Sequence, residues 1–214
     1  MPPVNSIIAV ALAGLALSAT PGPSMLYVLS RTVGQSRAAG LASALGLCLG
    51  GILLAIAAAL GMGAVLAASP ALLSAVRYIG SAYLIWLGLG MIRDAGRSAQ
   101  TNLTAAEVGQ RSLISIMWQG VLVELLNPKT VLFLALFLPP FVAVNQSPDP
   151  AASVTLQLLV LGVLVPLTAV PSDLLVAFLG GTLAHRLNRS RQTRVWLSWV
   201  AGLTLVGIAV SLHL

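Results

Sequence analysis

The distribution of apolar residues along the chain predicts six long helices. Each of six stretches is apolar over about 20 residues or more, which is the length that a helix needs to cross the hydrocarbon core of a bilayer. The stretches cover approximately residues 4–30, 39–67, 72–92, 113–144, 154–183 and 195–212. The polar gaps between them are short, so the pattern indicates one all-α integral membrane domain over residues 1–214.

Two of the six stretches contain a polar break. The breaks are Thr20-Pro21-Gly22-Pro23-Ser24 in the first stretch, and Glu124 with Asn127-Pro128-Lys129 in the fourth. Proline lacks an N–H, so Pro21 and Pro128 should free the carbonyls of Leu17 and Glu124 from their helical hydrogen bonds. One straight helix over 113–144 would also be about 48 Å long, well beyond a core of about 30 Å. Both stretches are therefore expected to break.

The two breaks lie at equivalent places in the two halves of the chain. Pro21 and Pro128 are 107 residues apart, which is half of the 214 residues. Halves of about 1–95 and 110–214 would each hold three transmembrane helices, and an odd number gives the halves inverted topology. The predicted fold is therefore two inverted three-helix repeats, with the first helix of each broken at proline. Paired breaks of this kind mark the midplane site of a transporter.

The composition supports a membrane protein and orients it. Hydrophobic residues make up 58% of the chain and charged residues only 7%, against roughly 25% charged residues in soluble domains. Nine arginines lie in alternate gaps between the apolar stretches: Arg31, Arg37, Arg93, Arg97, Arg111, Arg186, Arg189, Arg191 and Arg194. The positive-inside rule places these gaps in the cytoplasm of a bacterial inner membrane, with both termini periplasmic. The net charge of +6 is thus explained by topology rather than by nucleic acid, and membrane lipid is an expected partner.

Three ionisable residues lie well inside apolar stretches, namely Glu124, Lys129 and Asp173. An ionisable group at the centre of a span costs about 2.5–3.5 kcal/mol on insertion scales, so such residues usually face a bundle interior or a cavity. We expect Glu124 to bind a substrate amine and Asp173, or Glu124 itself, to take part in proton coupling. The alternative is a fixed structural ion pair between Lys129 and either Glu124 or Asp173.

The substrate site itself is predicted from the two breaks. An opened turn offers free carbonyls to a cation, and the start of the following half-helix can hold a carboxylate. An amino-acid zwitterion needs both. The predicted substrate-binding residues are Pro21, Gly22, Pro23, Ser24, Glu124, Asn127, Pro128 and Lys129.

Weaker features leave alternatives open. Ala42, Gly46 and Gly50 form a small-residue stripe that serves either packing within the monomer or a homodimer face. The single cysteine, Cys48, is expected to be a small core residue. The sequence gives no reason to expect a cofactor or a metal site. No catalytic set occurs, so an intramembrane enzyme is disfavoured.

Several short segments follow one another in a distinctive order: Pro21-Gly22-Pro23, Arg37 to Leu41, Ala44-Leu45-Gly46, Tyr78 to Gly88, Gly120, Asn127-Pro128-Lys129 and Phe133 to Pro139. Together they resemble the lysine exporter (LysE) family, and most closely its RhtB-type exporters of homoserine, threonine and homoserine lactone. The resemblance implies export of amino acids or similar metabolites, driven by the proton or another ion gradient. Glu124 stands where many members have asparagine, which favours a cationic group on the substrate.

The sequence thus predicts a secondary-active exporter of amino acids or amino-acid-like metabolites that works by alternating access. The rival interpretations are an exporter of another small solute, such as a cation or a toxic organic compound, and a non-transporting membrane scaffold.

Overall fold

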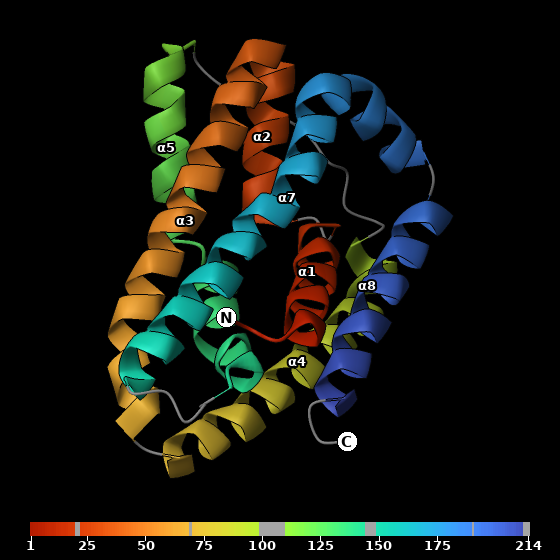
Figure 1. Ribbon diagram of the computed structural model, residues 1–214. Helices are drawn as coiled ribbons and strands as arrows, with labels where there is room; N and C mark the ends of the chain where they lie inside the picture. Colours follow the sequence, from red (N-terminus) through yellow and green to blue (C-terminus); the bar gives the residue numbers. More distant parts are fainter. Residues whose placement is uncertain (20–21, 69, 99–109, 144–148, 190, 212–214) are drawn as a thin grey trace.

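The computed structural model describes residues 1–19, 22–68, 70–98, 110–143, 149–189 and 191–211. Every regular element in these ranges is helical (Figure 1). The remaining residues, among them Pro21, lie outside this description, as do some side chains within the helices, among them Pro128 and the arginines of 186–194.

Both stretches with a predicted break are bent. The first consists of α1 (Val4–Ala19) and α2 (Pro23–Gly34), which meet at 52°. In the fourth, α5 (Leu113–Leu125) meets the segment Lys129–Phe141 at 50°. That segment contains most of α6 (Pro128–Leu132), the π-helical η1 (Phe133–Phe137) and the 3₁₀-helical η2 (Pro139–Phe141). Pro23 and Pro128 each occupy the first turn of the helix that follows, where a missing N–H costs nothing.

The other four predicted stretches are single helices. They are α3 (Arg37–Ala68), α4 (Pro70–Ser98), α7 (Pro150–Arg189) and α8 (Arg191–Ser211). Pro166 and Pro171 lie inside α7, which is continuous through both.

Within the described residues, two segments are long and apolar enough to span a membrane, Arg37–Met62 of α3 and Pro150–Gly180 of α7. The count rises to four if each bent pair is one span. In α4 the apolar part that meets the criterion for a shorter helix is Ser81–Arg93.

The apolar side chains form two separate cores. The larger core joins α1, α7, η1 and η2 to α4 and α8, with one buried residue of α3. Within it Phe133 stacks on Phe137 with ring centroids 4.3 Å apart, and Phe141 lies tilted against Phe137 with centroids 4.7 Å apart. The smaller core joins α2, α3 and α7. Among the described residues, neither α4 nor α8 contributes to the smaller core. In Figure 1, α2 and α5 lie in the upper part and α4 crosses the lower part, while α3 and α7 extend from the upper part to the lower left.

Glycines allow three pairs of helices to approach closely. A Cβ on Gly46 would collide with the carbonyl of Met117, and one on Gly50 would lie 2.8 Å from the carbonyl of Val121, so α3 packs directly on the backbone of α5. Gly51 meets the ring of Pro166 and so brings α3 against α7. Gly88 and Gly202 bring α4 against α8, because a Cβ on either glycine would collide with the carbonyl oxygen of the other. Gly46 and Gly50 therefore pack within the monomer, as the first of the two interpretations of the stripe expected.

Alanine at Gly46 should destabilise the folded chain. The added methyl group must displace a helix backbone, and overpacking of this kind costs about 1–3 kcal/mol. Gly61→Ala is the matched control, because nothing lies within 4 Å of its Cβ position and alanine is the better helix former by about 0.5–1 kcal/mol. Thermal unfolding in detergent, followed by size-exclusion of a fluorescent fusion, should show a lower midpoint only for Gly46→Ala. Equal midpoints would mean that the α3–α5 contact is looser than described.

Candidate functional site

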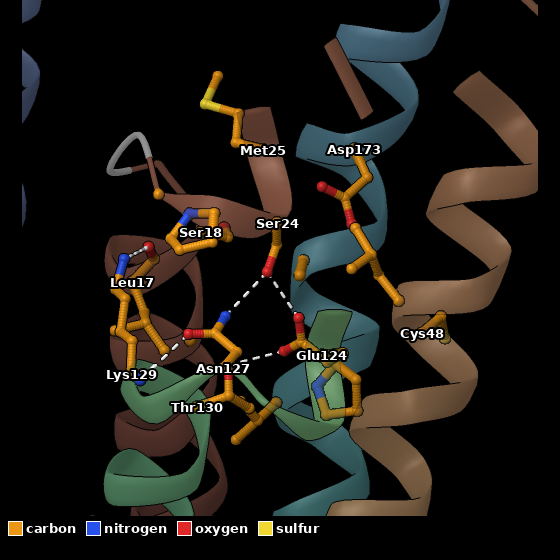
Figure 2. A pocket seen from close by; sticks show the side chains of 17 residues that line it. Leu17, Ser18, Ser24, Met25, Cys48, Glu124, Asn127, Lys129, Thr130 and Asp173 are labelled. Carbon is orange, nitrogen blue, oxygen red and sulfur yellow. Dashed lines mark hydrogen bonds between the residues drawn. The ribbon is translucent and has the colours of Figure 1, made fainter. Parts of the chain in front are cut away.

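A cavity lies between the two bends. About 650 Å³ of space not filled by protein atoms lies in and around it, open solvent at its mouth included. Its walls come from both broken stretches and from α3 and α7 (Figure 2). The described lining residues are Gly14, Leu17, Ser18, Gly22, Pro23, Ser24, Met25, Leu47, Cys48, Glu124, Asn127, Lys129, Thr130, Val165, Pro166, Ala169 and Asp173.

Glu124 is held by hydroxyl groups from both breaks. Ser24 Oγ, in the first turn of α2, donates to Glu124 Oε2 at 2.6 Å. Thr130 Oγ1, in α6, donates to Glu124 Oε1 at 2.7 Å. Hydrogen bonds to a charged acceptor are short and strong, and these two satisfy a carboxylate that is almost fully buried. Glu124 is thus fixed in position at the end of α5 (Figure 2).

Asn127 connects the same two segments. Its side chain is the N-cap of α6, where Oδ1 accepts the backbone N–H of Lys129 at 3.1 Å. Its Nδ2 donates to Ser24 Oγ at 2.9 Å. The asparagine therefore ends one half-helix, begins the next and orients the serine that donates to Glu124.

Lys129 crosses from the second break to the first. Its Nζ donates to the carbonyl oxygen of Leu17 at 2.8 Å, in the last turn of α1. This is the carbonyl that Pro21 was expected to free, and a cation at a helix C-terminus is favourable. The other expectation was wrong: the carbonyl of Glu124 is not free, because the N–H of Asn127 reaches it at 3.1 Å.

Lys129 forms no structural ion pair with a carboxylate of the cavity. Among the residues that the structure describes, neither Glu124 nor Asp173 lies within salt-bridge distance of its ammonium group. The fixed Lys129 ion pair considered as the alternative is therefore wrong. The cavity keeps one ammonium and two carboxylates that are not paired with one another.

Asp173, on α7, is the second carboxylate. It is only 8% exposed and lines the cavity, yet within the described part of the chain its oxygens have no hydrogen-bond or ion-pair partner. Figure 2 shows it on the opposite side of the cavity from Lys129, near Cys48 of α3. A buried carboxylate without a partner is costly when charged, so it will take a proton or a cation. This distinguishes it from the doubly bonded Glu124.

The structure brings together seven of the residues predicted from the sequence: Gly22, Pro23, Ser24, Glu124, Asn127, Lys129 and Asp173. Pro21 lies outside the described residues. Pro128 is the first residue of α6, and its side chain is not described. The sequence reasoning missed Ser18 and Thr130, whose polar side chains next to the two breaks were a usable signal. It also placed Cys48 in a core, whereas this half-buried cysteine lines the cavity.

The cavity offers groups for both charges of a small solute. Carboxylates and hydroxyls can bind an ammonium group, Lys129 can bind a carboxylate, and Met25, Leu47 and Val165 provide an apolar wall. Among the described residues, no three His, Cys, Asp or Glu side chains lie together in a way that could hold a metal ion.

Comparisons with known proteins extend over nearly the whole chain. Residues 15–214 match the family described as LysE type translocator. An uncharacterized membrane protein of Pseudomonas aeruginosa is 34% identical over 90% of this chain and 87% of its own length. A leucine efflux protein of an Enterobacter strain is 27% identical over 90% of this chain and 87% of its own length, and one of Klebsiella pneumoniae is 29% identical over 64% of each. No solved structure matches.

Replacing Lys129 with methionine should loosen the end of α1. The carbonyl of Leu17 would lose its donor, and an unsatisfied buried acceptor costs about 1–3 kcal/mol. Lys129→Arg is the matched control, because arginine keeps the charge and the donors. Hydrogen exchange read by mass spectrometry should show faster exchange in the last turn of α1 for the methionine variant. The same exchange rate in both variants would show that the bond to Leu17 does not stabilise α1.

Proposed function

Because the chain belongs to the LysE family of translocators, we propose that it exports amino acids or amino-acid-like metabolites across the bacterial inner membrane by alternating access. The family consists of transporters, not enzymes. The leucine efflux proteins among its relatives support an amino-acid cargo. The observation that carries the proposal is the cavity between the two bends, where Lys129, Glu124 and Asp173 meet inside an otherwise apolar chain.

The proposed arrangement is six spans in two inverted repeats. The first repeat comprises α1 with α2, α3 and α4; the second comprises α5 with α6 to η2, α7 and α8. Its support is the pairing of equivalent helices: α3 packs on α7, and α4 packs on α8. The proposed orientation has the arginine-rich ends in the cytoplasm and both termini in the periplasm.

The proposed substrate site uses residues of both breaks. Glu124, already oriented by Ser24 and Thr130, binds the ammonium group of the substrate together with the Ser24 hydroxyl. Lys129 and the starts of α2 and α6, at Gly22–Pro23 and Asn127–Pro128, favour the carboxylate. Pro21 belongs to the same break. Met25, Leu47 and Val165 pack against an aliphatic side chain, which is the kind of side chain that leucine carries.

Asp173 is the proposed coupling residue. Its carboxylate has no partner among the described residues, so it can exchange a proton without breaking another hydrogen bond. Glu124 was the other candidate from the sequence, but a proton there must compete with two hydroxyl donors. The proton motive force would then drive export through Asp173.

The division into two cores suggests which part of the molecule moves. Gly88 and Gly202 bring the backbones of α4 and α8 into contact, and among the described side chains this pair contributes to the larger core and not to the smaller one. We propose that the α4–α8 pair rocks between the two ends of the bundle as the cavity opens to one side and then to the other.

The competing function is export of another small solute. A cation exporter would need the two carboxylates but not Lys129. Retained export after Lys129→Met would therefore favour a cationic cargo over an amino acid. A membrane scaffold would tolerate neutralisation of all three charged groups.

Neutralising Asp173 should uncouple export from the proton gradient. In cells loaded with a leucine-, threonine- or lysine-containing dipeptide, Asp173→Asn should lower net amino-acid efflux at least tenfold. Exchange between internal and external amino acid should continue, because it needs no net proton movement. Asp149→Asn is the matched control, since Asp149 is exposed and asparagine retains its N-cap bond to Ala152. Full efflux in Asp173→Asn would remove this residue from the coupling step. Unchanged efflux of every amino acid on overexpression of the natural chain would overturn the export function.

Substrate should protect the only cysteine of the chain from alkylation. Cys48 lines the cavity, so a bound amino acid blocks the approach of a maleimide to its thiol. Alkylation of the purified protein should slow several-fold with leucine or another cargo amino acid. A metabolite that is not transported, such as a sugar, should have no effect. Equal alkylation rates with and without every transported amino acid would place the substrate elsewhere.

A further inference from the structure

Among the residues that the structure describes, four segments reach from the larger core to the smaller core. They are the two broken stretches, α3 and α7. The broken stretches pass from one core to the other at their breaks. In the first, α1 lies in the larger core and α2 in the smaller; in the second, η1 and η2 lie in the larger core, while Val123 of α5 packs on the smaller. Because the cavity is lined from both breaks, it lies between the two cores.

The helix α7 passes between the cores through its two internal prolines. The larger core ends at Val165, and the smaller core begins at Val176. Pro166 and Pro171 lie between them, and each removes one N–H from the helix, so two carbonyls lose their backbone donors. Asp173 lies in the same interval and lines the cavity (Figure 2). The residue proposed for coupling therefore stands where the backbone bonding of α7 is weakest.

Two hydroxyl groups weaken the helix further within this interval. Thr168 Oγ1 donates to the carbonyl oxygen of Val165 at 2.7 Å, and Ser172 Oγ donates to that of Ala169 at 2.8 Å. Hydrogen bonds of this kind compete with those of the helix backbone and often bend it. Sharp bends in long helices are found at proline and at such insertions. Residues 166–172 thus combine both causes of bending, and we call them the α7 segment.

Glycines of two neighbouring helices face the α7 segment. A Cβ on Gly14 of α1 would collide with Thr168 Oγ1, and one on Gly51 of α3 would lie 2.7 Å from the Cβ of Pro166. Gly51 also lies between the part of α3 that packs on the smaller core and the part that packs on the larger core. At these two contacts neither neighbour has a side chain that could interlock with α7 and prevent it from turning.

We propose that the α7 segment is the hinge about which the larger core, together with α4 and α8, turns relative to the smaller core. This inference rests on the proposed export function. Closely packed apolar cores resist deformation and move as units, so the change of shape falls on the segments that connect them. Three of these connections contain a break or a glycine at this level, and the prolines of α7 supply the fourth. Movement at the hinge opens the cavity toward one end of the bundle and then toward the other, and it changes the surroundings of Asp173.

The hinge can be tested without knowledge of the cargo by following the reaction of Cys48, which lines the cavity. Membrane vesicles of either orientation are treated with a membrane-impermeant methanethiosulfonate, and labelling is timed from each face. The natural chain should label from both faces, because the cavity opens to each in turn. Pro171→Ala restores a backbone hydrogen bond in the hinge, so the labelling rate should fall at least tenfold from one face and stay within twofold from the other.

The substitution at Pro171 leaves the cavity itself unchanged. This proline is exposed and is not among the described residues that line the cavity, and alanine is the better helix former, so the variant should melt at no lower temperature. In cells that export an amino acid, its maximal rate should fall at least tenfold, whereas the half-saturating concentration should change less than threefold. Pro166→Ala is the second variant and should give the same one-sided labelling. Pro150→Ala is the matched control, because Pro150 is the first residue of α7, where a missing N–H costs nothing, and it should label at the natural rates.

The outcomes separate the hinge from the export function. If the natural chain labels from both faces and both hinge variants label at the same rates, the hinge is overturned even where export is normal. If the natural chain labels from one face only, alternating access and the hinge are both wrong. If the variants show one-sided labelling but the natural chain exports no amino acid, the hinge stands and the cargo assignment is wrong. Lower melting temperatures in both variants with unchanged labelling would mean that the prolines serve packing alone.

Discussion

The structure depends on satisfying the polar backbone that two broken helices expose inside an apolar bundle. Without water, an unsatisfied N–H or C=O in the hydrocarbon region costs several kcal/mol. The bond from Lys129 to the carbonyl of Leu17 satisfies the end of α1. The Asn127 side chain satisfies the start of α6 and also reaches Ser24 at the start of α2. Each break is therefore stabilised by residues of the other.

This mutual dependence explains why a polar cavity persists where apolar packing would otherwise fill the space. Ser24, Glu124, Asn127 and Thr130 form a connected set of hydrogen bonds, and removing any member leaves a buried group without a partner. Asp173 stands apart from that set, within reach of the same space. One carboxylate is thus held by two hydroxyl groups, whereas the other has no hydrogen-bond partner among the described residues.

The packing around the cavity divides into firm and exchangeable contacts. Gly46 and Gly50 attach α3 to α5, and Gly88 and Gly202 attach α4 to α8, through backbone contacts that tolerate no added methyl group. The contact between α2 and α5 instead includes side-chain hydrogen bonds, such as those from Tyr27 to the carbonyl oxygen of Ile116 and from Arg31 to Gln119.

The sequence by itself determined the class of the protein, the six helical stretches and the positions of both bends. These follow from local causes: apolar length sets a span, and proline removes an N–H wherever it stands. Seven predicted site residues also lie together in the cavity, because polar residues in an apolar chain must gather where they can be satisfied. Only the tertiary structure decided the partners. In the folded chain Lys129 donates to the carbonyl oxygen of Leu17 rather than pairing with a carboxylate. Cys48 lines the cavity, and the buried Arg31 donates to Gln119. These partners depend on which helices contact one another and at what register, and neither can be predicted from a local pattern in the sequence.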